Sequence, residues 1–335
     1  EAHAHHPHGA GVHLGDDLGF WRGNDQPLPL AATNQCRILK GADALADGRP
    51  VDAEHSGKFR FGRQQFADLQ PAALGGELPL VTIDPPDAKD HDDAVHAEPD
   101  PDPKNPGGTI VTVAIADVAH YVRHGSALDR EAVKRGNSVY FPDRVVPMLP
   151  ERISNNLCSL REGEARPALA VRMRFSASGR KIAHSFHRVI MRSAAKLSYQ
   201  QAQSAIDGKP DDKSEPLLEP VLRPLWEAYA VLKRGRDERQ PLELDLPERK
   251  ILLKEDGTVN RVVVPPRLDA HKLIEEFMVQ ANVAAAETLE AKRQALVYRV
   301  HDAPSLAKQE ALREFLRTFE ISLARGAQLK PAQFN

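Results

Sequence analysis

Four aspartates lie within ten positions and have the side chains needed to bind metal ions. They are Asp84, Asp90, Asp92 and Asp93, a D-x5-D-x-D-D spacing. Carboxylates this close repel one another and raise each other's pKa unless cations compensate. Hard divalent ions prefer oxygen ligands, and magnesium in proteins pairs one or two carboxylates with substrate phosphates. Two such ions about 3.5–4 Å apart can activate water for phosphodiester hydrolysis. The cluster therefore suits metal-dependent phosphoryl chemistry.

Three other interpretations of the cluster stay open on spacing alone. A calcium-binding loop would share the run from Asp90 to Asp93, but the glycine and distal glutamate of such a loop are missing. A solvated surface turn is the ordinary setting of an acidic run. One aspartate could instead cap a helix, with the others incidental. Pro85 and Pro86 stiffen the turn and an apolar segment precedes it, which favours a site.

The segments around the cluster have the pattern of β-strands. We predict strands over residues 80–83, 93–97, 109–116, 168–175 and 182–190. The short connection between the second and third favours an antiparallel pair, with Asp117 at the end of the third strand. The last two strands form a hairpin. Residues 251–264 predict another hairpin, with its turn at Asp256-Gly257.

Helical patterns occupy much of the second half of the chain. Ser198 could cap a helix that runs to Ile206, and a basic-ended helix over 218–239 is interrupted or started by Pro220 and Pro224. Asp269 opens the clearest amphipathic helix. A last helix follows Ser305, with its apolar residues facing inward: Leu312, Phe315, Leu316 and Phe319. Because strands and helices are mixed and hairpins are common, the sequence predicts the α+β fold class.

Composition limits the class of protein. The chain has 335 residues, 41% of them hydrophobic and 27% charged, and a net charge of −2. A nucleic-acid partner would therefore be held by a local basic groove or through metal ions. The two cysteines, Cys36 and Cys158, are far apart, which argues against a disulfide framework or a zinc ribbon and fits a reducing compartment. With no membrane-length apolar run, we expect a cytoplasmic protein without a membrane partner.

The chain divides into two parts by pattern. Residues 1–75 form a poorly defined segment that opens with five histidines in thirteen positions, which predict either a metal-binding tract or a mobile polar terminus. Residues 76–335 carry the regular patterns and form the expected catalytic domain.

Several blocks in this second part closely resemble the RNase R/RNase II (RNB) family and in detail lie nearer to its RNase R branch. They are residues 80–84 (LVTID), 90–95 (DHDDAV), 113–122 (VAIADVAHYV), 138–142 (SVYFP), 146–150 (VPMLP), 157–160 (LCSL), 268–276 (LDAHKLIEE) and 298–301 (YRVH). Together they cover roughly residues 78–335. The resemblance implies an RNB-type catalytic domain, with a mixed, largely antiparallel sheet surrounded by helices.

The resemblance also implies an activity. Members of this family hydrolyse single-stranded RNA processively from the 3′ end and release nucleoside 5′-monophosphates. By matching position, Asp84, Asp90, Asp92 and Asp93 are its Mg²⁺-site carboxylates, and Mn²⁺ could take the same place. Single-stranded RNA is the expected partner of a monomeric chain.

Further residues gain roles only through this resemblance. Tyr140 matches the aromatic that stacks on the 3′-terminal nucleotide. Asp117 and His120 would support the acidic site, and Glu276 would face the RNA channel with its neighbour Glu275. Phosphate contacts are expected from arginines: Arg144, Arg152 and Arg166. By residue pattern alone, Tyr140 is also compatible with a half-buried core aromatic, and the charged residues with caps and solvated surfaces.

The sequence departs from the family at several points. Ile251 takes the place where the family usually has a second aromatic that clamps the terminal base. The chain stops at Asn335, before the family's block resembling His-Phe-Thr-Ser-Pro-Ile-Arg-Arg-Tyr, whose arginine stabilises the transition state. The S1 domain is absent too, and residues 1–75 lack the pattern of two cold-shock domains. We therefore expect a catalytic domain incomplete at its C-terminal end.

Three functions follow as hypotheses. The first is a Mg²⁺-dependent 3′→5′ exoribonuclease, whose activity would be lost in Asp93→Asn. The alternative is a catalytically impaired RNA-binding fragment, with salt-sensitive binding and no turnover. The third is a metal-dependent phosphatase that acts on small phosphates and has no preference for polymers.

Overall fold

The protein is described by a computed structural model that covers residues 78–242, 246–298, 300 and 302–323. The predictions for residues 1–75, including the histidine tract, lie outside the described residues. Within the described part, no helix is both long enough and apolar enough to cross a membrane.

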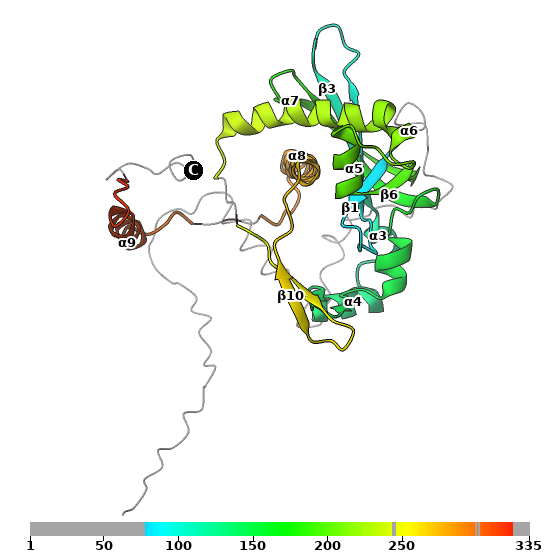
Figure 1. Cartoon of the computed structure of the whole chain (residues 1–335). Helices are drawn as coiled ribbons and strands as arrows, with labels where there is room; N and C mark the ends of the chain where they lie inside the picture. The colour runs from blue at the N-terminus through cyan, green and yellow to red at the C-terminus, as the bar shows by residue number, and fades with distance from the viewer. Residues whose placement is uncertain (1–77, 243–245, 299, 301, 324–335) are drawn as a thin grey trace, which may run out of the picture. The chain divides into compact units, whose positions relative to one another are not determined.

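A six-stranded sheet forms the centre of the fold (Figure 1). Its strands are β1 (Val81–Asp84), β2 (Asp93–Pro99), β3 (Thr109–Ala116), β6 (Ala165–Phe175), β7 (Lys181–Arg192) and β8 (Ala195–Ser198). The order is β7-β6-β3-β2-β1-β8, and every neighbouring pair is antiparallel except β1 and β8, which run parallel. The predicted α+β class, the largely antiparallel sheet and the strand positions are confirmed.

Two short hairpins stand apart from this sheet. One pairs β4 (Val139–Tyr140) with β5 (Val145–Val146), and the other pairs β9 (Lys250–Leu253) with β10 (Val259–Val263). The second hairpin turns at Gly257, whose φ of 81° lies in the left-handed region that glycine adopts without strain. The predicted hairpin over 251–264 is confirmed.

The helices and helical turns complete the described part. They are α3 (Val118–Tyr121), α4 (Ala127–Arg135), the π-helical turns η4 (Ile153–Leu157) and η5 (Leu218–Leu222), α5 (Tyr199–Ile206), α6 (Glu215–Leu217), α7 (Arg223–Arg239), α8 (Asp269–Ala291) and α9 (Leu306–Arg317). Pro220 lies within η5 and Pro224 in the first turn of α7, so the predicted interruption falls at the change from π-helix to α-helix.

One face of the sheet is covered by α5, α7 and α8 (Figure 1). Val81, Val95, Val113 and Val171 lie in register across β1, β2, β3 and β6 and are at most 2% exposed. Their branched side chains form a continuous apolar row against the helices. This layer fixes the end of β1, where the acidic cluster begins.

The opposite face carries alanines, which leave room for an approaching loop. Ala94, Ala114 and Ala170 are paired across β2, β3 and β6, and all three are fully buried. Cys158 and Leu160, which follow η4, belong to the same apolar cluster. Small side chains let this segment come close to the sheet, and it is this segment that contacts the acidic loop.

The prediction that the aromatic residues of the last helix face a core is wrong. Phe315 is 60% exposed and Phe319 is 61% exposed. The two rings lie 5.1 Å apart and pack edge to face on each other, four residues apart along the chain. Apolar spacing on α9 therefore makes a local aromatic pair and not a buried face.

Candidate active site at the end of strands β1 and β2

The acidic cluster lies on the loop between β1 and β2. Asp84 is the last residue of β1 and Asp93 the first of β2, so their backbones are held by the sheet. Asp90 and Asp92 lie on the loop, which begins at Pro85-Pro86 and turns where the Ala88 N–H donates to the Pro85 carbonyl at 3.0 Å. Proline cannot donate a ladder hydrogen bond, so the strand ends at the first carboxylate.

His91 holds this loop against the protein. It is only 3% exposed, and its Nδ1 lies 2.8 Å from Oδ2 of Asp84. Its backbone N–H donates to Oγ of Ser159 at 3.1 Å, and its carbonyl accepts from the Leu160 N–H at 2.6 Å. These bonds fix the first carboxylate and join the loop to the segment that follows η4.

Some of these carboxylates are buried, and they lie close enough to raise one another's pKa. Burial raises the pKa of Asp93 to about 7, and the charges of Asp84 and Asp92 add to this rise. The pKa of Asp92 is raised too, first by burial and then by Asp90 and Asp84. An added cation would relieve this repulsion.

Tyr199 and Ser198 bring a second part of the chain to the cluster. Ser198 is paired with Asp84 across the parallel strands β1 and β8, and its side chain caps α5 by accepting from the Gln201 N–H at 3.1 Å. Tyr199 follows as the first residue of α5. Burial raises its pKa to about 12, and the charges of Asp84, Asp93 and Asp92 contribute. Its ring stacks on His271 of α8 at a centroid distance of 4.0 Å.

The donor set is chemically suited to a hard divalent cation, because it consists of carboxylate oxygens with surplus negative charge. Within the described residues, no group of three His, Cys, Asp or Glu side chains converges into a finished metal site.

Comparisons with known proteins identify the family of this domain. The RNB domain family matches residues 75–333. The chain belongs to the RNB family. Ribonuclease R of Vibrio parahaemolyticus is 40% identical over 260 residues, which cover 77% of this chain and 30% of that protein. Ribonuclease R of Escherichia coli K12 is 39% identical over 260 residues, or 77% of this chain and 31% of that protein.

A solved structure shares the fold as well. Mycoplasma genitalium RNase R in complex with ribose-methylated single-stranded RNA superposes with a TM-score of 0.74 at 29% identity, over 84% of this chain and 43% of that one. The chain spans about a third of the length of the two curated relatives.

Two predicted RNA contacts of this RNB domain are exposed. Tyr140, on β4, is 71% exposed, and its neighbour Phe141 is 47% exposed. The guanidinium of Arg144 lies 5.2 Å from the centre of the Phe141 ring and its Nη1 donates to Asp143 at 2.8 Å. Ile251, on β9, is 40% exposed. Aromatic and cationic groups are thus available to a ligand on the β4–β5 hairpin.

Two other predicted RNA contacts make bonds within the protein. Arg166 donates to the carbonyl and side-chain oxygens of Asn156 at 3.1 and 3.0 Å and also binds Glu164. Glu276 is 1% exposed and accepts at 2.8 Å from Arg239. Its carboxylate therefore lies in the contact between α7 and α8.

Asp117 and His120 lie beyond the end of β3. Asp117 is 8% exposed and accepts from Nε of Arg188 on β7 at 2.8 Å. The His120 ring packs edge to face on Tyr121, with centroids 4.9 Å apart. These contacts order the chain after β3, on the face opposite the helices.

Sequence reasoning missed His91 and Tyr199 as site residues. The histidine stands inside the acidic motif, but its partners Ser159 and Leu160 lie about seventy residues later. For Tyr199 the one available signal was its place directly after a helix-capping serine. Neither signal by itself predicts which side chain meets the cluster.

Proposed function

We propose that this chain is the catalytic core of a hydrolase that removes nucleotides processively from the 3′ end of single-stranded RNA and releases nucleoside 5′-monophosphates. The observation that carries the proposal is the position of four aspartates within ten residues at the ends of β1 and β2 of an RNB domain, where burial, with the charges of Asp84 and Asp92, raises the pKa of Asp93 to about 7. Relatives named ribonuclease R and an RNA-bound relative support RNA as the substrate.

The proposed cofactor is Mg²⁺, with Mn²⁺ as a substitute, bound by Asp84, Asp90, Asp92 and Asp93. When bound, the ion would supply the positive charge that polarises the scissile phosphate and activates water. His91 keeps Asp84 in place through the 2.8 Å bond. Tyr199, with its pKa raised to about 12, keeps its proton at neutral pH and can donate a hydrogen bond beside the carboxylates.

RNA would be held through stacking and charge. The exposed Tyr140 would stack on the terminal base, and Arg144 would contact a phosphate. Ile251 offers an apolar contact in place of a second ring. The buried Glu276 and the bonded Arg166 would act by holding α7, α8 and η4 in position.

The test is hydrolysis of single-stranded RNA labelled at its 5′ end, compared with RNA labelled at its 3′ end. With Mg²⁺, we expect early release of labelled mononucleotide from the 3′ label and progressive shortening of the 5′-labelled strand. Asp93→Asn should abolish release, and Asp237→Asn, an exposed aspartate on α7, should not. A folded chain that leaves RNA intact in Mg²⁺ would contradict the proposal.

A second candidate is an RNA-binding domain without turnover. It is favoured by the β4–β5 hairpin, where Tyr140 is 71% exposed and the Arg144 side chain is 66% exposed, because these groups can bind a strand without a metal ion. In that case, RNA binding should weaken with salt and no mononucleotide should appear at any Mg²⁺ or Mn²⁺ concentration.

A further inference from the structure

A hollow of about 510 Å³ lies beside the acidic loop. Its lining residues are Ala88, Lys89, His91, Asn155, Arg161, Glu162 and Lys196. None of the four clustered aspartates is among them. The volume falls in the range of small-ligand pockets, about 300–1,000 Å³, and suits a ligand the size of a nucleotide.

The lining of this hollow is basic. Lys89, Arg161 and Lys196 supply three cations against the single carboxylate of Glu162. That carboxylate already accepts at 2.7 Å from Nζ of Lys213, which adds a further cation nearby. Positive charge is therefore in excess among the side chains that line the hollow.

The cations of the hollow are only partly neutralised by their own contacts. Nζ of Lys196 lies 3.4 Å from the carbonyl of Ala88, a neutral acceptor. Arg161 donates to the Asn155 carbonyl at 2.9 Å, and its nearest carboxylate, that of Glu164, is 3.8 Å away. A carbonyl oxygen carries no net charge, so these contacts do not cancel the positive charge of Lys196 and Arg161. Both side chains can still form charge-assisted hydrogen bonds to an anion.

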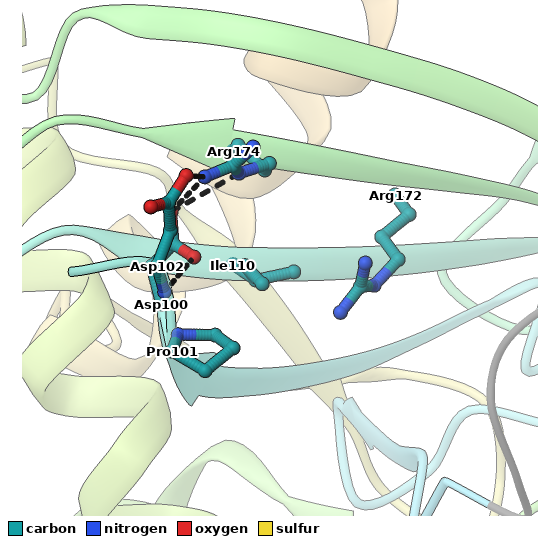
Figure 2. A pocket seen from close by; sticks show the side chains of 6 residues that line it. All are labelled: Asp100, Pro101, Asp102, Ile110, Arg172 and Arg174. Atoms are coloured by element: carbon teal, nitrogen blue, oxygen red, sulfur yellow. Dashed lines mark hydrogen bonds and ion pairs between the residues drawn. The ribbon is translucent and has the colours of Figure 1, made fainter. Parts of the chain in front are cut away.

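A second hollow shows what a neutralised site looks like. It measures about 320 Å³ and lies between the turn after β2 and the strands β3 and β6, lined by Asp100, Pro101, Asp102, Ile110, Arg172 and Arg174 (Figure 2). Arg174 binds Asp100 at 2.8 Å and Asp102 at 2.9 Å, and Arg172 binds Glu98 at 2.8 Å. Its arginines already have carboxylate partners, so this hollow has no surplus charge for an anion.

His91 connects the basic hollow to the acidic cluster. The ring of His91 bonds Asp84 through Nδ1 at 2.8 Å, and the same residue lines the hollow. Lys89 and Asp90 are likewise neighbours on one loop. A molecule bound in the hollow would therefore contact the loop that carries the metal-binding carboxylates.

We propose that this basic hollow binds a nucleoside 5′-monophosphate through its phosphate, as a product site next to the cluster. The inference rests on the proposed function for the origin of the ligand. At pH 7 a phosphate monoester carries about −1.5 to −2 charges, which match the excess of cations. Arg161 and Lys196 would contact the phosphate, and Asn155 offers polar groups to the sugar or base.

The test is calorimetric titration of the whole chain with AMP in EDTA, so that no divalent ion can bridge the phosphate to the aspartates. Saturable binding is expected. Arg161→Gln and Lys196→Gln should each weaken it about tenfold, since each removes a charge-assisted contact. Glu162→Gln should tighten binding, because it removes the negative charge of the hollow. Inorganic phosphate should compete with AMP, and adenosine should not bind.

Two matched variants show whether AMP binds in this hollow or elsewhere on the protein. Arg223→Gln removes an arginine on α7 that is 50% exposed, against 44% for Arg161, and is paired with Glu219; it should leave AMP affinity unchanged. Asp93→Asn should abolish RNA hydrolysis in Mg²⁺ and leave AMP binding in EDTA intact. Absence of AMP binding, or equal affinity in the wild type, Arg161→Gln, Lys196→Gln and Glu162→Gln, would overturn the inference even if RNA is hydrolysed. AMP binding with these shifts but without RNA hydrolysis would support the site and contradict the proposed function.

Discussion

Asp93 couples the charge of the site to the stability of the fold. Its pKa in the folded protein is about 7, well above the ordinary 3.8, so the folded state holds this proton more tightly than the unfolded chain does. Stability from this group is therefore present at low pH and is lost as pH rises through 7. In EDTA, Asp93 alone should lower the free energy of unfolding by urea by about 1–2 kcal/mol between pH 5 and pH 8, after allowance for solvent screening.

Asp93→Asn provides the matched comparison, because an amide has no charge to lose. The variant should be less sensitive to pH over the same range and more stable than wild type at pH 8 in EDTA. Mg²⁺ should stabilise the wild type at pH 8 and have less effect on the variant. Equal pH dependence in the two proteins would show that Asp93 ionises at its ordinary pKa.

Tyr199 should matter through its hydroxyl as well as its ring. Its pKa, raised to about 12 by burial and then by the aspartates, keeps it a hydrogen-bond donor at working pH. Tyr199→Phe retains the stack on His271 and removes the donor, so we expect turnover to fall about tenfold or more with little loss of stability. Tyr229→Phe, on α7, is the control. Unchanged steady-state kinetics in Tyr199→Phe would exclude the hydroxyl from the reaction.

At the scale of elements, Ser198 links helix formation to the site. Its side chain accepts from the Gln201 N–H at 3.1 Å, and its backbone N–H donates to the Gln201 side chain at 2.9 Å. Ser198→Ala should cost about 1 kcal/mol of stability. Because α5 begins with Tyr199, turnover should fall as well.

Ser305 offers a matched cap on a different helix. It caps α9 by accepting from the Lys308 N–H at 3.3 Å. Ser305→Ala should lower the stability of α9 by a similar amount, about 1 kcal/mol, and leave turnover unchanged. Parallel measurement of urea unfolding and RNA hydrolysis in both variants checks this. Equal turnover in the two would mean that the start of α5 does not position the site.

The sequence predicted the elements whose pattern is local. A run of apolar and β-branched residues identified β3, alternation identified β6 and β7, and apolar residues at helical spacing identified α8. The parallel pairing of β1 with β8 joins residues more than a hundred positions apart, and no local pattern carries that information. Spacing also misassigned Phe315 and Phe319, because the same periodicity arises from a surface pair.

The residues of the candidate site also fall into two groups, those that are close in sequence and those that only folding brings together. The four aspartates are visible because they lie within ten positions of the chain, so their spacing singled them out as candidates and the family resemblance assigned them to a metal site. The partners Ser159, Leu160 and Tyr199 reach the loop only through folding. The burial of Glu276 could not be predicted either, since its arginine partner Arg239 lies on another helix.

At the scale of the whole molecule, charge is sorted by region. The net charge is only −2, so the chain has no general attraction for RNA. Within the described part, negative charge is concentrated in the acidic cluster, and positive charge is found in the lining of the basic hollow beside it and at Arg144 on the β4–β5 hairpin. RNA affinity should therefore depend on a few local cations, each with a measurable share of the salt dependence.

Arg144 is the exposed cation expected to contact RNA phosphate, and salt dependence tests it directly. Each phosphate contact with a single strand contributes about −0.7 to the slope of log affinity against log salt, so Arg144→Gln should make the slope shallower by about that amount. Arg166 is only 12% exposed and holds Asn156, so Arg166→Gln should lower thermal stability and leave the slope nearly unchanged. Arg223→Gln should alter neither. Fluorescence anisotropy of a labelled single strand over a range of salt concentrations, with EDTA to prevent hydrolysis, gives the three slopes. If Arg144→Gln keeps the wild-type slope, the β4–β5 hairpin does not contact the RNA backbone through this arginine.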